Sequence, residues 1–398
     1  MISETIPRKS LIERVSVVRG RAPRSEPGVK TVLIGIALLW VVLTILNPRF
    51  LTADNLSNLV LQIAAVATLA MGAVLVLLLG EIDLSLGSVS GFAAAIMGVL
   101  NVNFGVPALL AIGGALVGGC LVGLLHGAIF TRFGVPSFVV TLGGLLTWQG
   151  AQLVVLGTTG NINITDPTII SLTSTYLPTV GAIGLAVIIL GLLVLTAVLR
   201  WRRRRSIGLV ESSLGWSLLK VLPVAIAIVA GVWILLSGRG VPVVVVIVLT
   251  ICWIISYFLR HQPMGRHVYA IGSNAEAARR TGIAVTKIRI LAFAAASTLA
   301  AIGGVLAASR LYAVNQSSGQ GDILLLAIAG AVIGGVSLFG GVGNIWYALL
   351  GSVLIGSIAN GMDLLSMPSS YRFVVTGAVL VLAVVVDAIA RRKAALRG

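Results

Sequence analysis

The chain contains a series of apolar runs that are each long enough to cross a lipid bilayer. About 20 predominantly apolar residues span the hydrocarbon core as a helix, and runs such as Leu59–Leu79 and Val241–Leu259 reach that length without a charged residue. The mean hydropathy of +1.08, with only 10% charged residues, extends this pattern to the whole chain. Because backbone groups inside lipid must bond within their own segment, these runs must be helices. The sequence therefore predicts an all-α, polytopic transmembrane helical bundle.

Twelve runs are predicted to cross the membrane. They are Thr31–Leu46, Leu59–Leu79, Ser88–Val102, Pro107–Phe130, Ser137–Leu156, Val180–Leu199, Leu218–Leu236, Val241–Leu259, Ile290–Ser309, Ile323–Leu338, Ile345–Met362 and Phe373–Ile389. Residues 31–390 would form one transmembrane domain between a basic tail, 1–30, and a short tail, 391–398. The longest polar stretches are too short for a separate soluble domain.

The basic residues alternate with the apolar runs in a way that orients the chain. Of 28 Lys and Arg residues, 22 fall in four clusters, at residues 1–30, Arg200–Arg205, Arg260–Arg289 and Arg391–Arg397. Cytoplasmic segments carry such an excess of positive charge. Twelve spans place all four clusters and both termini in the cytoplasm. We therefore attribute the net charge of +16 to cytoplasmic segments that orient the chain and contact anionic lipid, and not to the binding of nucleic acid.

The stretch Gly80–Gly91 is polar for its position, since it holds two acids and three glycines between two apolar runs. One interpretation is a short loop in which Asp83 caps the helix that follows. The other is a break inside the bilayer that lines a path for a solute. With such re-entrant pieces, ten full crossings would replace twelve, and the sequence leaves both alternatives open.

A polar island, Gly265–Ile283, lies between two apolar runs on the predicted cytoplasmic side. Ser273 and Asn274 can cap the start of a helix, Glu276 lies in its first turn, and two arginines lie near its end. Gly282 can close that helix. A short capped helix displayed outside the membrane indicates a docking element for another protein.

Several kinds of chemistry are missing from the sequence. There is no phosphate-binding P-loop motif and no His-Glu-x-x-His motif. The three histidines are scattered, and Cys120 and Cys252 lie in apolar runs as core residues. Carboxylates are nearly absent from span centres, where ion-coupled carriers place them. We therefore expect no catalytic residue, no metal site and no cofactor in this chain, and an energy source in a partner.

Uncharged polar and aromatic side chains near the spans favour a neutral, hydroxyl-rich solute. The residues expected to line its path are Gln62, Glu81, Asp83, Ser85, Ser88, Trp148, Gln149 and Asn360. Asn163, Asn315 and Gln316 are further candidates of the same chemical kind.

Three stretches resemble one family, the membrane-spanning permeases of bacterial ABC importers for ribose, xylose, galactose and related sugars. Gly80–Ser88 is similar to the family's Gly-Ile-Asp-Leu-Ser-Val-Gly-Ser signature. Gly265–Arg289 is similar to its Gly-Arg-x-x-Tyr-Ala-x-Gly-Gly-Asn segment and the residues that follow. The third is Ile333–Gly343, followed by Asn360–Leu365 and Val385–Asp387. With Val135–Leu142, these stretches cover most of Leu51–Arg392.

The resemblance implies that the island is the coupling helix of a permease in the bacterial inner membrane. The implied contacts with the ATPase are Arg266, Tyr269, Gly272, Asn274, Glu276, Ala277, Ala278, Arg279, Arg280 and Gly282. The implied partners are an ABC ATPase, which binds ATP and Mg²⁺, an extracytoplasmic sugar-binding protein and a second copy of the permease. Asn47–Asn58, Gly157–Thr179 and Arg310–Asp322 are the expected contacts for the binding protein.

Two differences from the family's common pattern bear on which solute is transported. The additional hairpin Leu218–Leu259, preceded by Arg200–Arg205, resembles the xylose-type members. The Glu-Leu-Asp that commonly precedes Ala-Ile-Ala in the family is replaced by Leu324-Leu-Leu, with Asp322 the nearest acid. D-xylose is the predicted solute. The alternatives are a stand-alone carrier or channel for a small polar solute and a polytopic membrane enzyme that would depend on His126 or Asp83.

Overall fold

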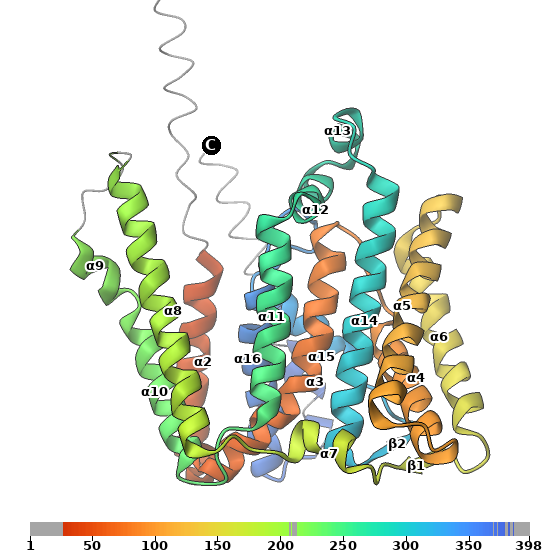
Figure 1. Cartoon of the computed structure of the whole chain (residues 1–398), viewed down its shortest axis with the longest axis horizontal. Coiled ribbons are helices and arrows are strands. Elements are labelled where there is room, and N and C mark those ends of the chain that lie inside the picture. Colours follow the sequence, from red (N-terminus) through yellow and green to blue (C-terminus); the bar gives the residue numbers. More distant parts are fainter. Residues whose placement is uncertain are drawn as a thin grey trace, which may run out of the picture.

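The computed structural model describes residues 27–206, 208, 213–368, 370, 371, 373–378, 381, 382 and 385. Most of the predicted N-terminal tail, the tail 391–398 and much of the predicted span Phe373–Ile389, with the end of the Val385–Asp387 motif, lie outside these residues. The described chain is a bundle whose long helices run side by side (Figure 1). Its helices are α2 (Pro27–Leu46), α3 (Ala53–Leu78), α4 (Leu86–Gly98), α5 (Ala108–Phe133), α6 (Ser137–Leu156), α7 (Pro167–Ser174), α8 (Thr179–Ser206), α9 (Leu214–Leu219), α10 (Leu222–Leu236), α11 (Val243–His261), α12 (Pro263–Ser273), α13 (Ala275–Arg280), α14 (Val285–Leu311), α15 (Ile323–Ile333) and α16 (Ile345–Leu364), with a 3-10 turn at Pro48–Leu51 and a π-helical turn at Val99–Asn103.

Within the described residues, eight helices are long and apolar enough to cross a membrane, and three apolar helices are shorter. The eight are α3, α4 with its π-helical turn, α5, α6, α8, α11, α14 and α16. Each predicted span from Thr31–Leu46 to Ile345–Met362 overlaps one of these helices, with two differences in extent given below. The chain is thus an all-α, multi-pass membrane protein, while the number of full crossings and the side of each terminus stay predictions.

Two predicted boundaries differ from the structure for local reasons. The span expected at Leu218–Leu236 is divided into α9 and α10, because Pro223 occupies the first turn of α10 and cannot continue a preceding helix. The span expected to reach Leu338 ends at Ile333. Gly335 there has a φ of +106°, which favours glycine and starts the loop that leads to α16.

Burial separates central helices from peripheral ones. Within their most apolar windows, 78% of the residues of α3 and 67% of those of α14 are buried, against 11% for α8. Figure 1 shows α8, α9 and α10 beside α2 at one edge of the bundle. Helix α8 and the first half of the additional hairpin Leu218–Leu259, α9 and α10, therefore lie on the outside of the bundle, and most of the apolar surface of α8 is left for lipid. The second half of that hairpin, α11, packs against α3 and α16.

The bundle's two ends differ in character. The arginine-rich end of α8 lies on the same side as α12 and α13, and α7, β1 and β2 lie on the opposite side (Figure 1). Strand β1 (Asn161–Asn163) pairs antiparallel with β2 (Ala313–Asn315), with Ile162 opposite Val314. This small sheet was not predicted, and it joins the segments Gly157–Thr179 and Arg310–Asp322 into one outer strap.

Helices α5 and α14 pack closely along a row of glycines. A Cβ atom added to Gly123 would collide with the carbonyl oxygen of Phe293, and one added to Gly119 or Gly127 would meet the backbone of Ser297 or Ile290. Inside a membrane, the association of helices depends on this kind of close packing, because acyl chains are as apolar as the side chains and the hydrophobic effect does not drive helices together. The row of glycines therefore fixes α5 against the central helix α14.

Substitution of one glycine in α5 tests this contact. Gly123→Ala should lower the free energy of unfolding by about 1–3 kcal/mol through overpacking, visible as a lower thermal midpoint in detergent. Gly113 lies in the same helix with no atom within 4 Å of an added Cβ. Gly113→Ala should therefore be neutral or raise stability by up to about 1 kcal/mol through helix propensity. Equal midpoints for both variants would contradict the packing.

Candidate functional site

The polar island contains two helices, α12 and α13, joined at Asn274. That residue is extended, with φ −163° and ψ 102°, and its side-chain oxygen accepts a hydrogen bond from the backbone N–H of Ala277 at 2.9 Å. The predicted cap is therefore present. Gly282 follows α13 with a φ of +85° and turns the chain toward α14. The sequence showed the cap of α13 but not the separate helix α12 before it.

Helix α13 extends beyond the membrane-spanning helices (Figure 1). Glu276 forms ion pairs with Arg279 at 3.5 Å and Arg280 at 3.3 Å, and all three side chains are exposed. Pairs this exposed contribute little to stability. Ala278 points inward and is buried. The charged face of α13 is thus available to another molecule, together with the exposed Arg266, Asn274, Ala277 and Gly282.

The other two residues of the predicted set anchor α12 to the bundle. The hydroxyl of Tyr269 donates to the carbonyl oxygen of Gly343 at 3.1 Å. A Cβ added to Gly272 would collide with the carbonyl oxygen of Leu78 and lie 2.5 Å from the nitrogen of Gly341. Only glycine fits between the end of α3 and the loop that connects α15 with α16. Tyr269 and Gly272 are half-buried and attach α12 to the bundle.

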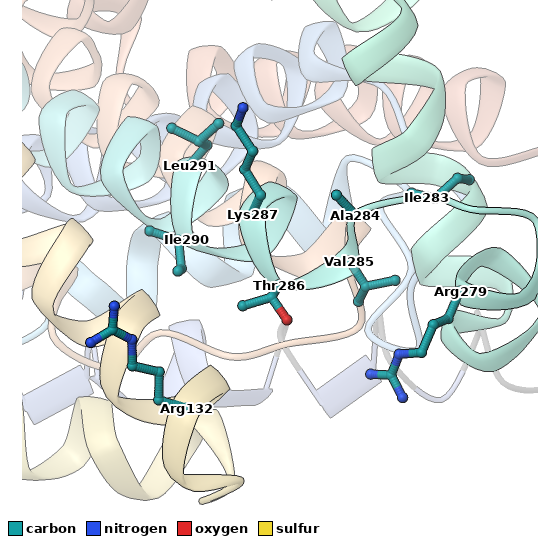
Figure 2. Close-up of a pocket in the computed structure, with 9 residues that line it drawn as sticks. All are labelled: Arg132, Arg279, Ile283, Ala284, Val285, Thr286, Lys287, Ile290 and Leu291. Carbon is teal, nitrogen blue, oxygen red and sulfur yellow. The ribbon is translucent and has the colours of Figure 1, made fainter.

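A depression of about 550 Å³ lies at the base of α13 (Figure 2). Its wall includes Arg279 of α13, Lys287 of α14 and Arg132 of α5, around apolar side chains that include Val285 and Ile290. Within the described part of the chain, neither Arg132 nor Lys287 forms an ion pair. The basic surface thus continues from α13 to the nearby end of α5.

A second cavity, of about 450 Å³, opens among α3, α4, α14, α15 and α16 beside the outer strap. Its polar lining consists of Gln62, Ser90, Arg310, Asn315, Ser317, Ser318, Gln320, Asp322 and Asp363. Gln152 of α6 is fully buried, and its amide nitrogen donates to the carbonyl oxygens of Asn315 at 2.8 Å and Ser318 at 3.0 Å. That contact holds the strap over the cavity.

The residues predicted for the solute path do not all meet in this cavity. Gln62 lines it, as does the further candidate Asn315. Asn360 instead exchanges hydrogen bonds with Asn55 at 2.9 and 3.0 Å. Gln149 of α6 is half-buried. Asn163 and Gln316 lie in the two segments of the outer strap.

The remaining predicted path residues, Glu81, Asp83, Ser85, Ser88 and Trp148, surround the break between α3 and α4. Asp83, Ser85 and Ser88 are buried, and none of them belongs to the lining of this outer cavity. The backbone N–H of Ile82 donates to Ser137 and that of Leu84 to Thr141, at 3.3 and 3.0 Å. Both hydroxyls belong to the first two turns of α6. The break is thus held by α6 side chains that satisfy its backbone.

A chain of hydrogen bonds leads from the break into α5 and α6. The Trp148 indole nitrogen donates to Nε2 of His126 at 2.9 Å, and an indole N–H can only donate. Nδ1 of His126 therefore carries the ring hydrogen and faces the Ser85 hydroxyl at 3.3 Å. That hydroxyl donates to the Asp83 carboxyl at 2.6 Å. In a nucleophilic triad the histidine stands between serine and acid. Here Ser85 stands between them, so the order of contacts is not that of a triad.

Four side chains that belong to these sites were not predicted individually from the sequence: Gln152, Arg289, Arg310 and Gln320. Arg289 pairs with Glu81 at 2.8 Å, and the other three belong to the outer cavity and its support. Each of the four is a polar residue inside or at the edge of an apolar run, and that position is the feature of the sequence by which it could have been found. Among the described residues, no group of three or more His, Cys, Asp or Glu side chains is positioned to hold a metal ion.

Comparison with known proteins adds the following. Residues 55–384 match the family model described as the permease component of the branched-chain amino acid transport system. The chain is 34% identical to the xylose transport system permease protein XylH of Haemophilus influenzae, over 91% of this chain and 96% of that protein. It is 36% identical to XylH of Escherichia coli K12, over 86% and 87%. Identity to the ribose import permease protein RbsC of Escherichia coli K12 is 31%, over 89% and 92%. No solved structure matches the chain.

The cap on α13 can be tested by its effect on local exchange. Asn274→Ala should cost this short helix about 1 kcal/mol and raise amide hydrogen exchange in residues 275–280. Asn274→Asp keeps an acceptor oxygen and should leave exchange near that of the wild type. Unchanged exchange in the alanine variant would show that α13 does not depend on the cap.

Proposed function

The chain belongs to the family of branched-chain amino acid transport system permease components, and from this premise we propose that it is the membrane-spanning subunit of an ABC importer for a monosaccharide, with D-xylose the first candidate. It is a multi-pass protein of the bacterial inner membrane. The observation that carries the proposal is the similarity to xylose and ribose permeases, which extends over nearly the full length of both chains. The additional hairpin Leu218–Leu259, which contains α10 and α11 and follows the arginine-rich end of α8, supports the xylose-type assignment.

The outer cavity supports a hydroxyl-rich solute. Amide groups of Gln62 and Gln320 can donate and accept, the guanidinium of Arg310 donates, and carboxylates accept. This combination matches a sugar, whose hydroxyls do both. Ser90 of α4 lines the cavity, Ser88 lies nearer the start of the same helix, and the break precedes that helix. We propose that the path continues past Ser88, Ser85, Asp83 and Glu81 when the bundle opens inward.

The exposed face of α13 supports docking of an ABC ATPase that binds ATP and Mg²⁺. A short capped helix can transmit a rigid-body displacement, and its ion-paired surface supplies charge for recognition. The basic depression at Arg132 and Lys287 extends that surface. Two permease copies around one path would present two α13 helices to an ATPase dimer.

The outer strap supports contact with a sugar-binding protein. Its two segments are joined by β1 and β2 and also by a hydrogen bond between the hydroxyls of Thr173 and Ser309 at 2.7 Å. The loop Asn47–Asn58 lies at the same end of the bundle, since α3 begins there. A binding protein seated on this face would release its sugar next to the cavity.

Charge reversal on α13 tests the docking. Glu276→Arg or Arg279→Glu should abolish copurification of the ATPase, because each places like charges together on the exposed face. Arg239→Glu is the matched control, since Arg239 and Asp54 form an exposed ion pair at 3.7 Å on the opposite side. Continued copurification with both α13 variants would refute the docking assignment. A stand-alone carrier would instead transport sugar in vesicles without any ATPase.

The cavity is tested by sugar-stimulated ATP hydrolysis in the reconstituted complex. Gln62→Ala removes an amide from the lining and should raise the half-maximal concentration of loaded binding protein by up to about tenfold, the value of one hydrogen bond. Asn103→Ala removes an exposed amide outside the cavity and should have no effect. Identical responses of both variants would remove Gln62 from the path, and a response to ribose but not xylose would correct the solute.

A further inference from the structure

The break between α3 and α4, residues Gly80–Ser85, contacts the base of α12 on one side. An added Cβ on Gly340, in the loop between α15 and α16, would lie 2.7 Å from the carbonyl oxygen of Gly272 and 2.8 Å from the nitrogen of Gly80. The N–H of Gly341 donates to the carbonyl oxygen of Leu78 at 2.9 Å. Three backbone segments therefore meet without intervening side chains: the end of α12, the end of α3 and this loop.

The same break is joined to α14 by a charged contact. Glu81 and Arg289 are paired at 2.8 Å, and their side chains are only 15% and 24% exposed. The guanidinium of Arg289 also lies over the ring of Phe130, 5.8 Å from its centre. Screening by water is weak at such a site, so this pair is stronger than the exposed pairs on α13.

Arg289 occupies a particular place in the chain. It lies in the second turn of α14, and four residues, 281–284, connect α14 to α13. A displacement of α13 therefore reaches the first turns of α14 directly. The pair with Glu81 carries that displacement to the break, while α12 reaches the same break through Gly272 and Gly340.

On its far side, the break is bonded to α5 and α6. Ser137 and Thr141 of α6 accept from its backbone, and Ser85 is linked to His126 of α5. Helix α4 begins at Leu86, directly after the break, and about one turn later Ser90 and Gly91 line the outer cavity. The break thus lies between the docking elements and the cavity lining, with bonds to both.

We propose that Glu81 and Arg289 are positioning residues that couple movement of the docked α13 to the α3–α4 break and, through α4, to the sugar path. The inference rests on the proposed function and adds to it a route for the force. The salt bridge transmits both push and pull between α14 and the break. Loss of either charge leaves the partner half-buried and unpaired, so the two elements separate. The ATPase then hydrolyses ATP without moving the sugar.

The test measures sugar transported per ATP hydrolysed by the full complex in proteoliposomes. Arg289→Gln should retain the bound ATPase and basal hydrolysis but lower that ratio roughly tenfold, within the range that coupling between sites reaches, and Glu81→Gln should lower the ratio as far. The exchanged pair, Glu81→Arg with Arg289→Glu, should restore a substantial part of the ratio. The matched control, Arg203→Gln at the exposed end of the peripheral helix α8, should transport as the wild type does.

A conservative variant keeps the test decisive if a neutralised protein does not assemble. Glu81→Asp retains the charge and shortens the side chain by one methylene, and it should lower the ratio while the thermal midpoint and copurification are kept. A wild-type ratio in Glu81→Asp or in the glutamine variants overturns the inference, as does an exchanged pair no better than the single variants. A wild-type complex that neither binds the ATPase nor transports sugar would instead refute the proposed function.

Discussion

Backbone amides inside a lipid-embedded bundle have no water to bond with, and every interruption of a helix there must be satisfied by the protein itself. The break after α3 meets this requirement with hydroxyls of Ser137 and Thr141 and with the Asp83 carboxyl. Helix α6 is thereby tied to a segment more than fifty residues earlier in the sequence. The polar break is a structural junction first, and any part it takes in transport depends on that bonding.

Close contact between backbones is the second condition on which the architecture depends. The central position of α14 relies on the glycines of α5, and the position of α12 relies on Gly272 against the end of α3. Both contacts exclude even a methyl group. A docking element attached in this way cannot shift independently of α3, whereas one attached through long side chains could.

The features that could be predicted from the sequence are those that depend on a local pattern of residues. Apolar runs located the helices, Asn274 marked the start of α13, and polarity near a span located Gln62 in the cavity. The pairs Glu81–Arg289 and Ser85–His126 were not predicted, because each joins helices whose proximity follows only from packing. The pairing of β1 with β2 has the same origin, since neither three-residue segment has a strand signal of its own. Helix α15 ends at Ile333 because glycines follow it. The apolar run continues past those glycines, so hydropathy alone did not predict the end of the helix.

Helices α12 and α13 are subject to different constraints, although they are neighbours in the chain. Nearly every side chain of α13 faces outward and only Ala278 is buried, whereas Gly272 and Tyr269 of α12 are held by backbone contacts. Mutations on the exposed face of α13 should therefore leave the bundle intact. If α13 docks the partner as proposed, replacing its exposed residues would be enough to change that partner, and α13 is the natural segment to exchange when importers with new subunit combinations are assembled.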